Sequence, residues 1–89
     1  MKKGFVYIIQ DTYTHHLYIG STDDVNRRLQ QHKYGHTYTT RRMHEIILIF
    51  VQEFKTITQA RRIEMWLKKL KRRDYIEKII SDGSIRKKF

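Results

Sequence analysis

Residues 4–24 have the sequence GFVYIIQDTYTHHLYIGSTDD, and this stretch decides the fold. Two segments of it, Gly4–Gln10 and His15–Gly20, are rich in aromatic and β-branched residues, which are typical of strands. The residues between them, 11–14, favour a turn. Because the connection is this short, we expect the two strands to form an antiparallel hairpin.

A helix is predicted directly after the hairpin. Ser21–Asp24 supplies a helix cap and first-turn acids, which suit the positive end of the helix dipole. The helix runs to about Lys33, and Gly35 can end it. At about 100° per residue, Val25 and Leu29 fall on the face that we expect to pack on the core.

The second half of the chain predicts one strand and two helices. Ile46–Val51 is an uninterrupted apolar run, typical of a strand buried on both faces. Thr56 and Gln59 have the spacing of a capping box for a helix that ends near Arg72, and Asp74 can cap a final short helix. The order β-β-α-β-α-α predicts an α+β fold, with a three-stranded antiparallel sheet and flanking helices.

Composition limits the classes to which the protein can belong. Its 89 residues suffice for one domain, which we expect at 1–82, followed by a flexible basic tail at 83–89. The absence of cysteine excludes disulfides, thiolate metal sites and cysteine nucleophiles. No apolar run approaches the roughly 20 residues that span a bilayer, and no signal-peptide pattern is present. We therefore expect a cytoplasmic protein without a membrane partner.

The formal net charge is +10, a large positive field for so small a domain. Such a field suits a polyanionic partner, so nucleic acid is favoured over a purely solubilising role. A membrane surface is a weaker alternative, because no long apolar helix face supports the basic residues.

Two polar residues share the apolar face of the first predicted helix. Arg28 and His32 lie one turn apart on it, whereas the neighbouring Arg27 points to solvent. An arginine beside a core stripe either extends to the surface or is directed at a ligand, and the helix alone leaves both open. In the hairpin, Tyr7 and Tyr18 lie on one face of the sheet if they are paired. Paired tyrosines on a sheet more often have a packing role than a catalytic one.

Glu64 is the second anomaly, because it falls inside the apolar arc of the long helix and within a strongly basic segment. A local ion pair with Lys68, four residues on, is one interpretation. The other is a hard oxygen ligand for Mg²⁺ or Mn²⁺, surrounded by cations that hold phosphates. The five histidines show no spacing typical of a zinc site.

Together these positions resemble the GIY-YIG nuclease family, which includes the N-terminal nuclease domain of an excinuclease. Phe5-Val6-Tyr7 stands where the first motif falls and keeps its tyrosine, and Tyr18-Ile19-Gly20 matches the second motif. Arg28 has the spacing of the catalytic arginine, and His32 that of a residue one turn further on. Ala60, Glu64 and Lys68 reproduce the spacing around the metal-binding glutamate.

The resemblance implies a single-metal endonuclease that hydrolyses DNA, structure-selective and linked to repair or recombination. Glu64 would bind one Mg²⁺ or Mn²⁺, Arg28 would clamp the phosphate, and Tyr7, Tyr18 or His32 would act as base or relay. The remaining expected contacts to the substrate are Gly20, Arg41, Arg42, Lys68 and Lys69.

The sequence leaves three alternative roles open, each with its own partner. The expected partner is nucleic acid, DNA rather than RNA, with a further protein for targeting. The same fold could instead bind DNA or RNA without cutting it. A third possibility is a protein-interaction module that uses the exposed edge of its sheet.

Overall fold

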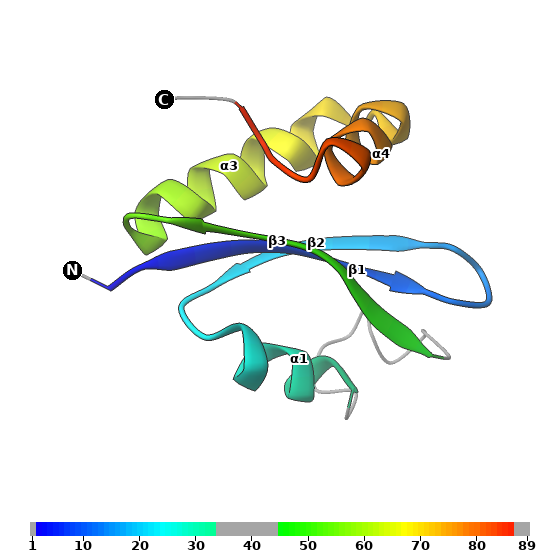
Figure 1. Cartoon of the computed structure of the whole chain (residues 1–89), viewed down its shortest axis with the longest axis horizontal. Coiled ribbons are helices and arrows are strands. Elements are labelled where there is room, and N and C mark those ends of the chain that lie inside the picture. Colours follow the sequence, from blue (N-terminus) through cyan, green and yellow to red (C-terminus); the bar gives the residue numbers. More distant parts are fainter. Residues whose placement is uncertain (1, 34–44, 87–89) are drawn as a thin grey trace.

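The computed structural model describes residues 2–33 and 45–86, and it confirms the three-stranded antiparallel sheet and the order β-β-α-β-α-α (Figure 1). The strands are β1 (Gly4–Asp11), β2 (Leu17–Thr22) and β3 (Ile46–Phe54), arranged in the order β2-β1-β3. The helices are α1 (Val25–Lys33), α3 (Ile57–Leu70) and α4 (Arg73–Asp82). Helices α3 and α4 cover one face of the sheet, and α1 lies against the other.

β1 is the central strand and pairs antiparallel with both of its neighbours. Because side chains alternate along a strand, Val6 and Ile8 face the core beneath α3 and α4, whereas Tyr7 and Ile9 face the side of α1. All four side chains are at most 2% exposed. β1 is therefore the strand that is buried on both faces.

The prediction that Ile46–Val51 is buried on both faces is wrong. β3 lies at an edge of the sheet, and three of its apolar residues, Ile47, Leu48 and Val51, are between 37% and 45% exposed. Only Phe50 in this strand is fully buried. Apolar continuity does not measure burial, because a folded protein leaves much apolar surface in contact with water.

Helix α3 begins as predicted, and the Thr56 hydroxyl accepts a hydrogen bond from the Gln59 amide at 3.1 Å. It ends at Leu70, because Lys71 adopts a left-handed conformation with φ of 50°. The predicted cap of the last helix is wrong. Arg72 holds the cap position, and Asp74 lies in the first turn, where it pairs with Arg72 at 2.8 Å. Within residues 2–33 and 45–86, no helix has the length and apolar content needed to cross a membrane.

Helix α1 is capped by Asp24, whose carboxylate accepts from the Arg27 amide at 3.1 Å. Its packing differs from the prediction. Val25 and Leu29 are only half-buried, and the fully buried side chain of the helix is the polar His32. The face of α1 that meets the sheet is therefore built around a polar contact.

Part of the expected tail belongs to the fold. Ile85 is 5% exposed and lies in the core, and its backbone is held at both ends by the Gln52 side chain of β3. The Ile85 amide donates to Gln52 Oε1 at 2.6 Å, and Gln52 Nε2 donates to the Ile85 carbonyl at 3.2 Å. The domain thus extends beyond residue 82, at least to Ile85, and residues 87–89 lie outside the described part of the chain.

Candidate active site

The polar side chains of interest gather where the hairpin meets α1, beside the edge strand β2. Tyr7 from β1 and Tyr18 from β2 have ring centroids 6.4 Å apart. The two residues are not paired with each other, since Tyr7 pairs with Gly20 and Tyr18 with Ile9. A two-residue change of register returns side chains to the same face, so the two tyrosines share a face despite the different pairing.

Gly20 lies directly beneath the ring of Tyr7. A Cβ atom at position 20 would overlap the hydroxyl and the Cζ atom of Tyr7. Only glycine therefore allows the tyrosine ring to lie across β2. The sequence pointed to Gly20 as a place of close approach by substrate, whereas the group that approaches it here is the ring of Tyr7, so Gly20 positions that ring.

Gly20→Ala is expected to lower the free energy of unfolding by roughly 1–3 kcal/mol, the usual cost of overfilling a packed site. Urea denaturation measures the change. In a Tyr7→Ala background the same substitution should cost much less, because the ring that the new methyl group would meet is gone. Equal costs in the two backgrounds would show that the crowding at position 20 does not involve Tyr7.

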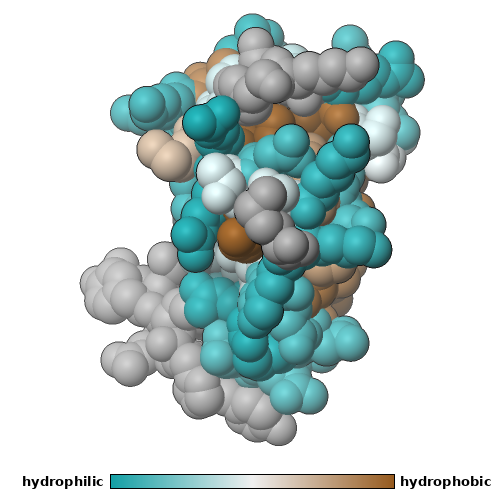
Figure 2. All heavy atoms as spheres, turned by 90° about the vertical axis from the view of Figure 1, so that its left-hand side faces the viewer, coloured by the Kyte–Doolittle hydropathy of each residue, from teal (hydrophilic) through white to brown (hydrophobic). Residues whose placement is uncertain are grey.

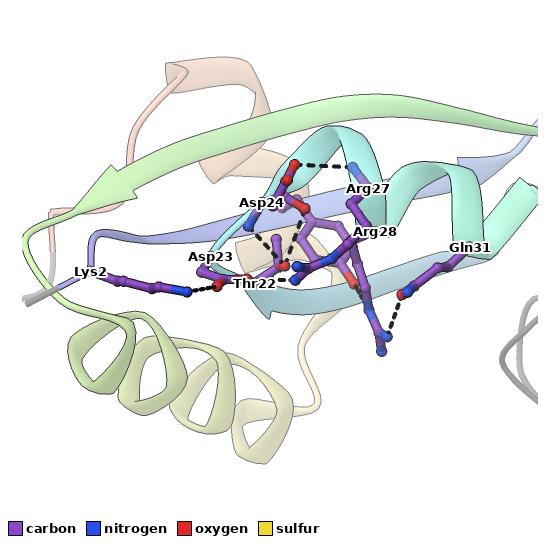
Figure 3. A network of polar contacts seen from close by, with 8 residues as sticks. Lys2, Thr22, Asp23, Asp24, Arg27, Arg28 and Gln31 are labelled. Atoms are coloured by element: carbon purple, nitrogen blue, oxygen red, sulfur yellow. Dashed lines mark hydrogen bonds and ion pairs between the residues drawn. The ribbon is translucent and has the colours of Figure 1, made fainter.

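Tyr7, Arg28 and His32 form one hydrogen-bonded group between the sheet and α1. The Tyr7 hydroxyl lies 2.7 Å from His32 Nε2 and accepts from Arg28 Nε at 3.4 Å. Arg28 Nη1 also donates to Gln31 Oε1 at 3.0 Å, as Figure 3 shows. Arg28 is thus directed at the sheet, whereas Arg27 points outward as predicted and pairs with Asp23 at 2.6 Å.

Burial sets the protonation of this group. It raises the pKa of Tyr7 to about 12 and outweighs the hydrogen bond from Arg28, which acts in the opposite direction. It lowers the pKa of His32 to about 4, and the positive charge of Arg28 adds to that effect. At neutral pH Tyr7 therefore keeps its proton and His32 is uncharged. Arg28 does lower the pKa of Tyr7, but burial outweighs that effect, so Tyr7 is a poorer base than an exposed tyrosine.

The buried, neutral His32 should make stability depend on pH. Its pKa is about 4 in the folded protein and about 6.5 in an unfolded chain, so the unfolded state binds more protons as the pH falls between these values. The stability that it contributes is complete above pH 6.5 and is lost as the pH falls towards 4. We expect a loss of roughly 2–3 kcal/mol, measured by urea unfolding across this range.

His32→Gln should remove this part of the pH profile, because glutamine does not titrate. His16→Gln is the matched control, since His16 is exposed, and it should keep the wild-type profile. If His32→Gln and wild type lost the same stability between pH 6.5 and 4, the assigned protonation of His32 would be incorrect.

Tyr18 connects the two sides of the site. Its ring meets His32 edge-on with centroids 4.9 Å apart, and Lys68 Nζ from α3 lies 5.5 Å from the centroid of the Tyr18 ring. The pKa of Arg28 is raised, first by the hydrogen bond to Tyr7, and Tyr18 contributes in the same direction. Tyr18 is only half-buried, whereas Tyr7 is 2% exposed. Of the two tyrosines, Tyr18 is the more accessible to a ligand.

Glu64 reaches β2 from the opposite face of the sheet. Its Oε1 accepts from the Ser21 hydroxyl, and its Oε2 pairs with Lys68 Nζ at 2.5 Å. The ion pair with Lys68 that the sequence suggested is therefore formed. The same ammonium group also lies beside the Tyr18 ring, so Lys68 links Glu64 to Tyr18. Sequence reasoning missed Ser21, whose only signal is its position directly after Tyr18-Ile19-Gly20.

A polar pocket of about 460 Å³ opens beside Arg28 and Ser21. Lys2 and Arg61 line it together with Asp23, which pairs with Lys2 at 3.4 Å (Figure 3). Figure 2 views the molecule from the side where the N-terminus and the start of α3 lie, and hydrophilic side chains dominate this face. Lys2 and Arg61 carried no signal in the sequence beyond their charge, and the fold brings them to one pocket.

The remaining predicted substrate contacts separate into two groups. Lys68 is part of the site, as described above. Lys69, the next residue of the helix, is exposed and points roughly 100° away around the helix axis. Arg41 and Arg42 lie outside the described residues.

Two known proteins show partial similarity to the chain. The UPF0213 protein BH0048 from Bacillus halodurans, solved by NMR in solution, is 29% identical, with a TM-score of 0.56 over 91% of this chain and 86% of that one. A stretch of 34 residues is 44% identical to the "Putative MSV199 domain-containing protein 146R" of Invertebrate iridescent virus 6. That match covers 37% of this chain but only 14% of the viral protein.

The family comparison covers most of the chain. The model of the GIY-YIG catalytic domain matches residues 3–78, which include both tyrosine motifs, α1 and α3. The matched region holds Tyr7, Tyr18, Arg28, His32 and Glu64, which the fold brings to the β2 edge. The chain belongs to the GIY-YIG family of nuclease domains.

Proposed function

We propose that the protein is an endonuclease that hydrolyses phosphodiester bonds in DNA with the help of one divalent metal ion. The observation that supports this most is the placement of Arg28 and Glu64 on opposite sides of one edge strand, with Tyr18 between them. A phosphate at this edge can contact a guanidinium and a carboxylate-bound cation together. Membership of a nuclease-type family points to a nucleic-acid substrate.

Glu64 is the residue that would hold Mg²⁺ or Mn²⁺. Carboxylate oxygens suit both ions, and Mg²⁺ commonly uses one or two carboxylates together with substrate phosphates and water. When bound, the metal supplies charge stabilisation for the scissile phosphate and the departing 3′-oxygen. Lys68 occupies Glu64 Oε2 here, but its side chain is 47% exposed and flexible, so it can turn towards a phosphate instead.

Arg28 would hold the scissile phosphate. A guanidinium offers parallel donors that match two phosphate oxygens, which an ammonium group cannot do. Its hydrogen bonds to Tyr7 and Gln31 fix its orientation before substrate arrives. The Arg28 guanidinium can therefore stabilise the negative charge that develops on the phosphate during hydrolysis, and it need not reorient to do so.

Tyr18 is the residue we assign to take the proton of the attacking water. It is half-buried, so it is more accessible to a water or a phosphate than Tyr7, and its ring lies beside Lys68. Tyr7 suits this role less well, because it is 2% exposed and its pKa is raised to about 12. Tyr7 and His32 instead position Arg28 and the ring of Tyr18.

The chemical groups at the two ends of a cut DNA strand show which bond of the phosphodiester was broken. Attack on phosphorus with the 3′-oxygen leaving produces a 5′-phosphate and a 3′-hydroxyl, the two groups that DNA ligase joins. We expect nicks that the wild-type protein makes in plasmid DNA to be resealed by ligase without prior end repair. Nicks that need a phosphatase or kinase before resealing would contradict the proposed direction of attack.

A non-catalytic DNA- or RNA-binding module is the second candidate. The observation in its favour is that Ser21 and Lys68 already engage both oxygens of Glu64, as in a structural ion pair. Salt-sensitive binding without cleavage in Mg²⁺ or Mn²⁺ would favour it. Structure selectivity, a role in repair or recombination and a targeting partner are parts of the proposal that rest on the family resemblance.

A further inference from the structure

A groove of about 370 Å³ lies on the α3 side of β2, at the turn between α3 and α4. Its floor is aliphatic and consists of Leu17, Ile19, Leu67 and Ile76. Leu67 and Ile76 belong to the core, but Leu17 and Ile19, on the edge strand, are only half-buried. The volume falls in the range of roughly 300–1,000 Å³ that is typical of ligand pockets.

Cations surround this apolar floor. Lys68, Lys71, Arg72 and Arg73 line the groove, and all four are exposed. The acids near them, Glu64, Asp74 and Glu77, form pairs with Lys68, Arg72 and Arg73. The pairs of Arg72 and Arg73 are solvent-exposed and therefore weak, so a phosphate can replace these two carboxylates. The groove therefore combines an apolar surface with a basic rim.

The groove is continuous with the candidate active site through one side chain. Lys68 lines the groove, pairs with Glu64 at 2.5 Å and lies beside Tyr18. The other side of the site is different, because the pocket next to Arg28 is polar and suits phosphates. A nucleic-acid strand with a phosphate at Glu64 would therefore lie between the polar pocket on one side and the apolar groove on the other.

We propose that this groove is a nucleobase subsite, which holds the base of a nucleotide next to the scissile phosphate. A nucleotide matches both features, since its base has an apolar face and its phosphate is an anion. The base must leave its stack to enter, as in other proteins that hold a base between apolar side chains. The proposal rests on the proposed function only in that a nucleic-acid strand crosses the site at Glu64.

Methyl NMR spectra in EDTA test the subsite without any cleavage. Wild-type protein is titrated with a short oligodeoxyadenylate, and separately with an abasic deoxyribose-phosphate oligomer of the same length. The ring current of a purine should shift the methyl signals of Leu17, Ile19, Leu67 and Ile76. The abasic oligomer, which has phosphates only, should leave these methyl signals in place. The Ile47 methyl groups, on the opposite edge of the sheet, should not respond to either oligomer.

A pair of variants gives the affinity that the base contributes. Ile19→Ala should weaken binding of the oligodeoxyadenylate roughly fivefold and leave binding of the abasic oligomer unchanged, since it removes apolar surface alone. Ile47→Ala is the matched control on the other edge strand, and it should change neither affinity. Equal weakening for both oligomers by Ile19→Ala would overturn the proposal.

The two proposals can fail separately. Methyl shifts specific to the base-bearing oligomer, in a protein that cuts no DNA, would support the subsite and oppose the nuclease. DNA cleavage by a protein whose groove methyl signals respond equally to both oligomers, or to neither, would support the nuclease and overturn the subsite.

Discussion

Glu64→Gln is expected to reduce DNA cleavage roughly 1,000-fold while leaving DNA binding nearly intact. Glutamine keeps the shape of the side chain and can still accept the hydrogen bond from Ser21, but it lacks the charge that a divalent cation requires. Metal stabilisation of a phosphoryl transition state contributes several kcal/mol, and each 1.4 kcal/mol or so corresponds to a tenfold change in rate. Single-turnover cleavage in Mg²⁺ and in Mn²⁺ measures the effect.

Glu77→Gln is the matched control for Glu64→Gln. Glu77 makes the same kind of contact, an ion pair with a cation four residues away on the same helix, and it pairs with Arg73 at 2.9 Å. The substitution changes the net charge equally, and Glu77 makes no contact with Tyr18, Arg28 or Glu64, so single-turnover cleavage at saturating protein should stay within about twofold of wild type. If the two variants lost cleavage to the same extent, net charge rather than metal binding would explain the loss.

Arg28→Lys is expected to lower the cleavage rate by roughly 1,000-fold, and Arg28→Ala by at least as much. Arginines that stabilise phosphoryl transfer contribute about 10³ to 10⁵ in rate, and lysine does not reproduce their paired donors. The melting temperature should change little, because Arg28 is half-exposed and its partners Tyr7 and His32 remain bonded to each other. Single-turnover cleavage and thermal unfolding measure the two effects.

The neighbouring Arg27 provides the control. Its side chain is 55% exposed and pairs with Asp23 outside the tyrosine group, so Arg27→Ala should retain most of the cleavage. A sharp fall of the melting temperature in Arg28→Ala with unchanged cleavage would contradict the assignment. Arg28 would then be a structural residue that links α1 to the sheet.

The sequence predicted the fold class correctly because the fold class follows local periodicity. Alternation in the hairpin and the 3.6-residue period of the helices indicate which residues share a face, and so place Arg28 with His32. The capping role of Thr56 was predicted correctly for the same reason. The ion pair Glu64–Lys68, one of two interpretations that the sequence left open, is also formed between residues one helical turn apart.

The features that the sequence did not predict depend on contacts between distant segments. The hairpin register placed Tyr7 opposite Gly20, and the turn residues do not encode that choice uniquely. The position of β3 at an edge, and the packing of Ile85 against Gln52, are set by which strand becomes central. The bond from Ser21 to Glu64 joins residues 43 positions apart, and no local pattern indicates it.

The most direct test of the central claim is a nicking assay on supercoiled plasmid and branched DNA. Wild type, Glu64→Gln and Glu77→Gln are incubated with Mg²⁺, with Mn²⁺ and with EDTA. We expect cleavage by wild type and Glu77→Gln in either metal, none in EDTA, and almost none by Glu64→Gln under any condition. Cleavage by Glu64→Gln at the wild-type rate, or cleavage by wild type in EDTA, would contradict a metal-dependent nuclease site at Glu64.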